Sequence, residues 1–266
     1  MTDGQDPFGQ KRDESQEASV AQLASRAMAV LASKKAKGRP LLSERLAAQL
    51  ADAAREKSDA AMQGAITDIL HSGVPADEIL DFYIPEAARR LGEAWCSDGA
   101  GFADVTIATA RLQRSLRMLA ETPRSRRPMG RAEASVLVAV IEGEYHTLGA
   151  MVLTEQMRRR GVSVRLLLGE SDATILDTVA DGHFDAIFLS VAVAEKLAHV
   201  RDLVEKTRRV AQHGVPVVVG GAIGQFGPDI KTVTGADYVA TDAREALRLC
   251  GLTISHHGAD QRLTTG

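Results

Sequence analysis

Apolar residues in the second half of the chain form short runs that alternate with amphipathic segments. The run at 135–141 is followed by helical periodicity over 146–160, and this alternation continues as far as residue 249. Short apolar runs followed by amphipathic stretches are typical of buried parallel strands joined by helices. The pattern therefore predicts an α/β domain with a five-stranded, flavodoxin-like (Rossmann-type) parallel sheet in the order 2-1-3-4-5. The predicted strands cover 135–141, 162–168, 186–189, 215–219 and 238–240.

The first half of the chain has helical periodicity without such runs. Segments 41–71, 76–95 and 103–120 are rich in Ala, Leu and charged residues, with apolar positions three or four apart. This spacing places the apolar side chains on one face of a helix. We expect a helical bundle or a looser helical cap that precedes the sheet.

A basic segment with two prolines separates the helical half from the alternating half. Such segments are typical of linkers between domains. We expect the domain organisation to be a polar N-terminal extension with one short helix at 1–39, a helical cap domain at 40–121, a linker at 122–132, the sheet domain at 133–252 and a tail at 253–266.

Composition narrows the possible functions. The 266 residues are 45% hydrophobic and 25% charged, with a net charge of −3, so a broad nucleic-acid surface is not indicated. The two cysteines lack metal-type spacing, and this is typical of a reducing cytoplasm. The N-terminus has no apolar signal region and no apolar run is long enough for a membrane span. We expect a cytoplasmic protein without a membrane partner.

A histidine follows the first predicted strand, in the loop that leads to the next helix. In a parallel sheet of this type, ligands bind beyond the carboxyl ends of the strands. Glu144 lies two residues before His146 and could hold one ring nitrogen, leaving the other for a metal. Gly149 would let a bulky ligand approach the backbone. The alternative is that His146 is an ordinary polar loop residue.

Two further features fall at the carboxyl ends of strands. Ser190 follows the third strand, and Gly220 and Gly221 follow the fourth. A serine there often caps a helix and paired glycines often form a tight turn. No Gly-x-Gly-x-x-Gly or Walker loop follows the first strand, so phosphate cradling is not indicated. A hydroxyl and bare backbone beside a histidine suit a long, flat ligand.

Residues 131–249 resemble the cobalamin-binding domain shared by methionine synthase, corrinoid proteins and cobalamin photoreceptors. The family motifs Asp-x-His-x-x-Gly, Ser-x-Leu and Gly-Gly correspond here to Glu144-x-His146-x-x-Gly149, Ser190-Val191-Ala192 and Gly220-Gly221. The resemblance implies that His146 binds cobalt from the lower face and that the nucleotide tail lies between Ser190 and the glycine pair. Glu144 replaces Asp and Ala192 replaces Leu, and these departures lengthen the supporting arm and loosen the tail pocket.

The helical half extends this resemblance. Residues 91–95 and 101–106 are similar to the helical cap of cobalamin photoreceptors, in which a tryptophan covers the upper face of the corrin; Trp95 is its counterpart here. Val105 and Thr106 stand where those proteins have Glu and His, so the upper histidine ligand is absent. The alternative is that Trp95 is a core aromatic of the helical bundle.

The sequence motifs at residues 142–149 and 92–96 are similar to those of the AerR/PpaA regulators of photosynthesis genes in purple bacteria. This resemblance implies a light- and redox-responsive transcriptional antirepressor, not an enzyme, that acts on a partner repressor and meets DNA only through it. The sequence shows no helix-turn-helix pattern. Two alternatives remain: a haem sensor on the same scaffold, since one histidine serves either metal, and a corrinoid methyl carrier or mutase module.

Overall fold

The computed structural model describes residues 42–252, except residues 57, 98, 123–131, 133, 212–213 and 226–228 and the side chains of 224 and 225. The chain divides into a unit of residues 1–41 and a second unit that contains every element below. The predicted N-terminal extension, all but the ends of the predicted linker, and the tail from residue 253 lie outside the described residues.

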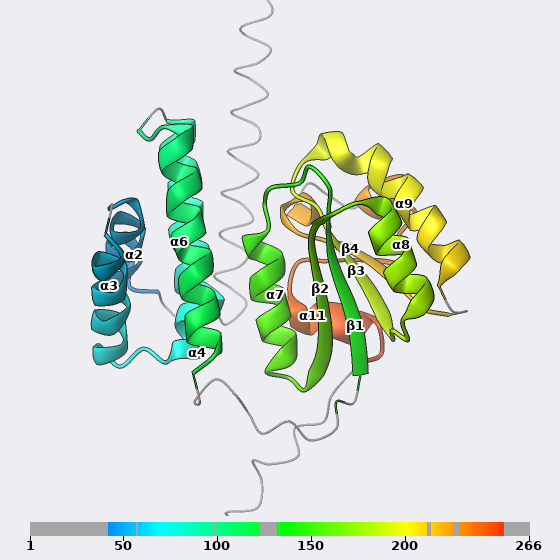
Figure 1. Ribbon diagram of the computed structural model, residues 1–266, viewed down its shortest axis with the longest axis horizontal. Coiled ribbons are helices and arrows are strands. Elements are labelled where there is room, and N and C mark those ends of the chain that lie inside the picture. The colour runs from blue at the N-terminus through cyan, green and yellow to red at the C-terminus, as the bar shows by residue number, and fades with distance from the viewer. Residues whose placement is uncertain are drawn as a thin grey trace, which may run out of the picture. The chain divides into compact units, whose positions relative to one another are not determined.

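The second half of the chain forms a five-stranded sheet in the order β2-β1-β3-β4-β5, with every adjacent pair parallel (Figure 1). This order confirms the prediction. The strands are β1 Ala134–Ile141, β2 Val162–Glu170, β3 Ala186–Ser190, β4 Val217–Gly220 and β5 Tyr238–Ala240.

Helices cover both faces of the sheet because the central strands are apolar on both sides. The residues of β1 alternate between two cores. Val136, Val138 and Val140 pack in a cluster with α7 Leu148–Arg158 and α11 Ala243–Leu249. The intervening residues of β1 pack with the other face, where α8 Asp172–Asp181 and α9 Leu197–Val210 lie (Figure 1). Helix α10 Asp229–Thr234 contributes Ile230 to the same cluster.

Several predicted boundaries were wrong by one or two residues. Ser190 and Gly220 are the last residues of β3 and β4, not loop residues after them. The N-cap of α8 is Ser171, whose hydroxyl accepts a hydrogen bond from the Thr174 N–H, and not Asp172. Asp172 lies in the first turn instead. The helix predicted at 193–213 is a 3-10 turn, Ala194–Lys196, followed by α9.

The helical half forms a bundle. Its elements are α2 Glu44–Arg55, α3 Asp59–His71, α4 Ala76–Glu78, the π-helical turn η1 Ile79–Tyr83, α5 Ile84–Cys96 and α6 Phe102–Ala120. The single helix predicted at 41–71 was wrong, because Glu56 is extended and Ser58 caps a second helix. Helices α2, α3, α5 and α6 share one apolar cluster, called here the bundle core.

Helix α7 belongs to both halves. Ala150 and Met157 are buried in the sheet core, while Leu148, Met151 and Val152 are buried in the bundle core. A helix that is apolar on two sides is stable only between two partners. The loop before α7, which carries His146, is therefore placed where the bundle meets the carboxyl edge of the sheet. No helix among the described residues combines the length and apolar character that a membrane span needs.

Candidate functional site

The loop between β1 and α7 turns sharply and presents its histidine to solvent. Gly143 has a positive φ of 71°, and the Glu144 N–H donates to the Ile141 carbonyl. The Glu144 residue is buried at 4% exposure, whereas the His146 side chain is 63% exposed. The loop thus has a buried carboxylate at Glu144 and a solvent-exposed imidazole at His146.

The Glu144 carboxylate holds the imidazole in place. Oε1 accepts hydrogen bonds from the His146 backbone N–H at 2.9 Å and lies 2.5 Å from ring Nδ1, and Oε2 accepts from the Ala192 N–H at 3.0 Å. Burial raises the pKa of Glu144, but these hydrogen bonds more than offset it and the pKa is lowered. The ionised carboxylate therefore fixes Nδ1. Among described residues, Nε2 makes no hydrogen bond and is the nitrogen available to a metal.

Ser190 lies on the α7 face of the sheet, in a row across its carboxyl edge. The strand register pairs it with Val140 and Gly220, and Gly220 pairs with Ala240. Alternation along β3 places Ser190 on the same face as Phe188, in the cluster under α7. Ser190 is 8% exposed, and its hydroxyl makes no hydrogen bond with another described residue. A hydroxyl that makes no hydrogen bond within the protein can bond to water or to a ligand.

The glycine pair is explained mainly by packing. Gly221 has a φ of 94°, and a Cβ there would lie 2.4 Å from the Val191 carbonyl oxygen. A Cβ at Gly220 would lie 2.8 Å from the Ala240 carbonyl oxygen. The backbones of β3, β4 and β5 thus approach closely at these positions. Of the two, Gly220 shares the row of Ser190, and Gly221 is used by the turn itself.

Gly149 differs from both. It lies in the first turn of α7, and apart from the adjacent residues and backbone of that helix no described atom lies within 4 Å of the point where its Cβ would be. No packing contact demands a glycine at this position. That a ligand approaches the backbone at Gly149 stays a prediction.

Trp95 is not a core residue, so the core-aromatic alternative was wrong. Its side chain, at the end of α5, is 49% exposed, and its ring centroid lies 6.2 Å from that of Phe102, which is 72% exposed. Large exposed aromatic side chains often mark binding surfaces.

The bundle helix α6 connects this aromatic pair with the histidine loop. Gln113 Nε2 donates to Thr147 Oγ1 at 2.9 Å. Phe102 precedes Gln113 by 11 residues, or about three helical turns. It therefore lies on nearly the same side of α6 as Gln113, about 16 Å from it along the helix axis. The N-terminal part of α6 therefore extends past the point of contact with the loop. Thr106, on that side too, donates its hydroxyl hydrogen to the Phe102 carbonyl.

Sequence reasoning missed Gln113 and Thr147. A glutamine on an amphipathic helix and a threonine before a helix are common, and nothing in the local pattern pairs them. Lys196 was also missed; its Nζ lies 3.4 Å from the Glu142 carbonyl, at the base of the same loop.

Among the described residues, no group of three or more His, Cys, Asp or Glu side chains could hold a metal ion. His146 offers a single nitrogen. One ligand from the protein suits a metal whose other positions are filled by a macrocycle.

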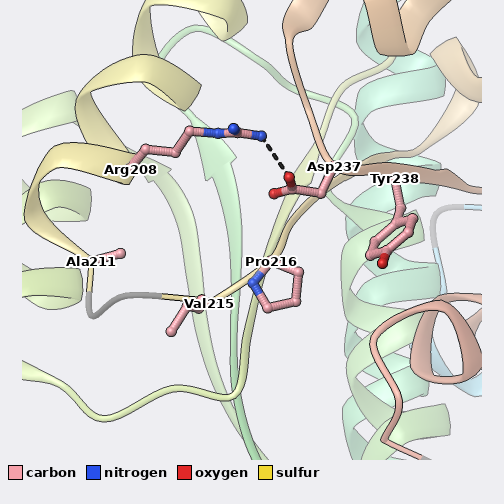
Figure 2. Close-up of a pocket in the computed structure, with 7 residues that line it drawn as sticks. Arg208, Ala211, Val215, Pro216, Asp237 and Tyr238 are labelled. Carbon is pink, nitrogen blue, oxygen red and sulfur yellow. Dashed lines mark hydrogen bonds and ion pairs between the residues drawn. The ribbon is translucent and has the colours of Figure 1, made fainter.

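A separate hollow of about 340 Å³ lies at the opposite, amino-terminal edge of the sheet, between α9 and the starts of β4 and β5 (Figure 2). Arg208 donates at 2.8 Å to both Asp237 and the Gly235 carbonyl, and the Val217 N–H donates to the second Asp237 oxygen. The charges at this hollow satisfy each other. None of the predicted site residues lines it.

Comparisons with known proteins identify the sheet domain. The sequence profile of the B12 binding domain matches residues 134–250. The chain is similar to an uncharacterized 20.5 kDa protein in the bchF-crtJ intergenic region of Rhodobacter capsulatus, with 39% identity over 170 residues. The alignment covers 64% of this chain and 88% of that protein. This chain has a B12-binding domain and belongs to the family of that protein.

The fold agrees with this assignment. The monomethylamine corrinoid protein of Methanosarcina barkeri superposes with a TM-score of 0.64 at 18% identity, over 79% of this chain and 99% of that one. The B12-binding domain contains all the predicted site residues except Trp95, which lies in the bundle. The haem alternative gains no support from these comparisons.

Proposed function

We propose that this protein is a cobalamin-binding, light- or redox-responsive transcriptional co-regulator, an antirepressor that acts through a partner repressor. The observation that carries the cobalamin half is the His146 loop of the B12-binding domain, in which Glu144 holds Nδ1 and Nε2 makes no hydrogen bond to a described residue. The relative lies in the bchF-crtJ intergenic region, and this, together with the resemblance to regulators of photosynthesis genes, supports the regulatory half. The proposal includes no enzymatic activity.

The residues present fit a cobalamin. His146 Nε2 would bind the cobalt, and the Ser190 hydroxyl and the open space at Gly149 would accommodate the nucleotide tail beside α7. The exposed rings of Trp95 and Phe102 would form an apolar wall on the far side of the corrin. When bound, a cobalamin would supply a metal centre that responds to light or to redox state.

The cobalamin half is tested by titrating the purified protein with hydroxocobalamin and recording the absorption spectrum. We expect wild-type protein to retain the cofactor on gel filtration with the spectral shift of a histidine-ligated cobalt. His146→Ala should lose that shift, because it removes the nitrogen donor. His183→Ala is the matched control, since His183 is exposed in the loop before β3, at the other edge of the sheet. Equal spectra for His146→Ala and wild type would contradict the assignment.

The regulatory half is tested with the repressor and its promoter DNA. We expect the protein alone to leave the mobility of the DNA unchanged, and the cobalamin-loaded protein to reduce the mobility shift that the repressor produces. A direct shift by this protein alone would contradict an action through a partner. If the protein instead transfers the methyl group of bound methylcobalamin to an acceptor, the methyl-carrier alternative replaces the proposal.

A further inference from the structure

Among the described residues, side-chain polar contacts join the bundle to the sheet domain at two places, and both lie at the ends of α7. At one end Arg159 pairs with Asp81 of η1 and lies 3.9 Å from Asp77. At the other end Gln113 of α6 donates to the hydroxyl of Thr147. Only the second contact touches the loop that carries His146.

Thr147 is in the position of an N-cap without acting as one. Threonine at an N-cap ordinarily accepts a hydrogen bond from an N–H of the first turn and has an extended backbone. Here the backbone is helical, with φ −86° and ψ −20°, and the side chain makes no capping bond. Its hydroxyl is instead engaged by Gln113 at 2.9 Å. The Thr147 hydroxyl is therefore bonded to the bundle, and not to a backbone N–H in the first turn of α7.

The histidine loop is consequently held from two sides. Glu144 ties the His146 ring and backbone to Ala192 at the end of β3, on the sheet side. Gln113 holds the next residue along the chain, Thr147, on the bundle side. Any displacement of the imidazole must be absorbed by the short segment between these two anchors. Because Leu148 and Met151 are buried in the bundle core, the displacement reaches the bundle as well.

We propose that Gln113 is the positioning residue through which ligand binding at His146 is communicated to the helical bundle. Through this hydrogen bond, a displacement of the loop displaces α6. The bond also fixes the orientation in which the loop holds the imidazole ring. This inference rests on the proposed function, namely that a cobalamin binds at His146.

The test is amide hydrogen exchange of residues 114–120, with and without hydroxocobalamin. These residues lie beyond Gln113, toward the C-terminus of α6, away from the aromatic pair and from direct contact with a ligand at the carboxyl edge. In wild-type protein we expect binding to change their exchange rate. In Gln113→Met and Thr147→Val, we expect that change to be reduced about fivefold or more, the lower end of couplings between sites.

Two matched variants separate this role from a general structural one. Gln49→Met removes a similar bond, Gln49 to Asp68, between α2 and α3 inside the bundle, and should leave the ligand-induced change intact. Thr147→Ser retains the hydroxyl and should restore it. All variants are compared at saturating cofactor, checked by absorption.

The outcomes distinguish the two proposals. If wild-type protein binds cobalamin but exchange at 114–120 is unaffected, or is affected equally in Gln113→Met, the coupling through Gln113 is wrong and the proposed function stands. If wild-type protein does not bind cobalamin, the proposed function fails and the coupling fails with it.

Discussion

At position 144 a buried carboxylate accepts three hydrogen bonds, two from the backbone N–H groups of His146 and Ala192 and one from the His146 ring. Glu144→Gln should lower cobalamin affinity about 10–100-fold, the usual cost of losing a residue that orients a metal ligand. The reason is that Gln keeps only one acceptor oxygen, so it cannot accept from both the Ala192 N–H and the ring. Absorption titration measures the effect. Glu142→Gln is the control, because that side chain is exposed in the same loop. Equal affinities for the two variants would show that the carboxylate does not orient the ring.

The same residue predicts a pH dependence of stability. The pKa of Glu144 is lowered from its ordinary value of 4.5 in the folded state, so its ionised form stabilises the fold. This stabilisation is present above pH 4.5 and is lost as the pH falls through the lower folded pKa. Urea unfolding should show wild type more stable than Glu144→Gln by about 1–3 kcal/mol at neutral pH. The difference should shrink in acid; a difference that grows there would contradict the sign.

Gly221 is constrained by the backbone just after β3. Gly221→Ala should destabilise the protein by about 3 kcal/mol or more, because the residue has positive φ and its Cβ would meet the Val191 carbonyl oxygen at 2.4 Å. Gly73→Ala is the matched control. Gly73 has a φ of 86° but open space around it, so only the conformational cost of about 1 kcal/mol applies. Urea midpoints measure both, and similar losses would mean that the loop after β4 relaxes.

At the scale of elements, the π-helical turn η1 aims Asp81 at α7. Arg159, which is 12% exposed at its side chain, pairs with Asp81, which is 19% exposed. Asp81→Asn should cost about 1–3 kcal/mol of unfolding free energy, because it leaves a mostly buried guanidinium without its charged partner. Asp77→Asn should cost less than about 1 kcal/mol, since Asp77 is 54% exposed and 3.9 Å away. Equal costs in urea unfolding would contradict this division.

Helix α7 explains how one element serves both the fold and the site. Its sheet side and its bundle side are both apolar, and its N-terminus follows directly from the His146 loop. A π-helical turn often marks a functional position in a helix. Here η1 contacts the far end of α7, so both ends of this helix are held by the bundle.

At the scale of the whole molecule, the bundle covers the outer side of α7. A fragment of residues 132–252 should expose Leu148, Met151 and Val152 together and self-associate, because contiguous apolar patches of this kind drive association. Light scattering after gel filtration measures the mass of the fragment. The same fragment with Met151→Gln and Val152→Gln should be monomeric. A monomeric unmodified fragment would show that the sheet domain does not need the bundle.

The sequence by itself determined the alternation of strands and helices, the strand order and the positions of Glu144, His146 and Ser190 at the carboxyl edge. These follow from local periodicity and from the rules that connect parallel strands. The N-cap at Ser171 was missed, because a one-residue shift of a helix end hardly changes the hydrophobic pattern. The break at Glu56 was missed, because a short interruption between Arg55 and Asp59 leaves the composition of the segment helical.

Only the tertiary structure decided which groups meet. Glu144 reaches Ala192 across 48 residues of chain, and Gln113 reaches Thr147 across 34. Trp95 could be placed on a helix from its spacing, but its exposure depends on which helices pack around it. Hydrogen bonds between distant residues and the packing of α7 between two cores depend on how the elements are brought together. Local periodicity records the face that each element buries, and it does not record the partner on the other side.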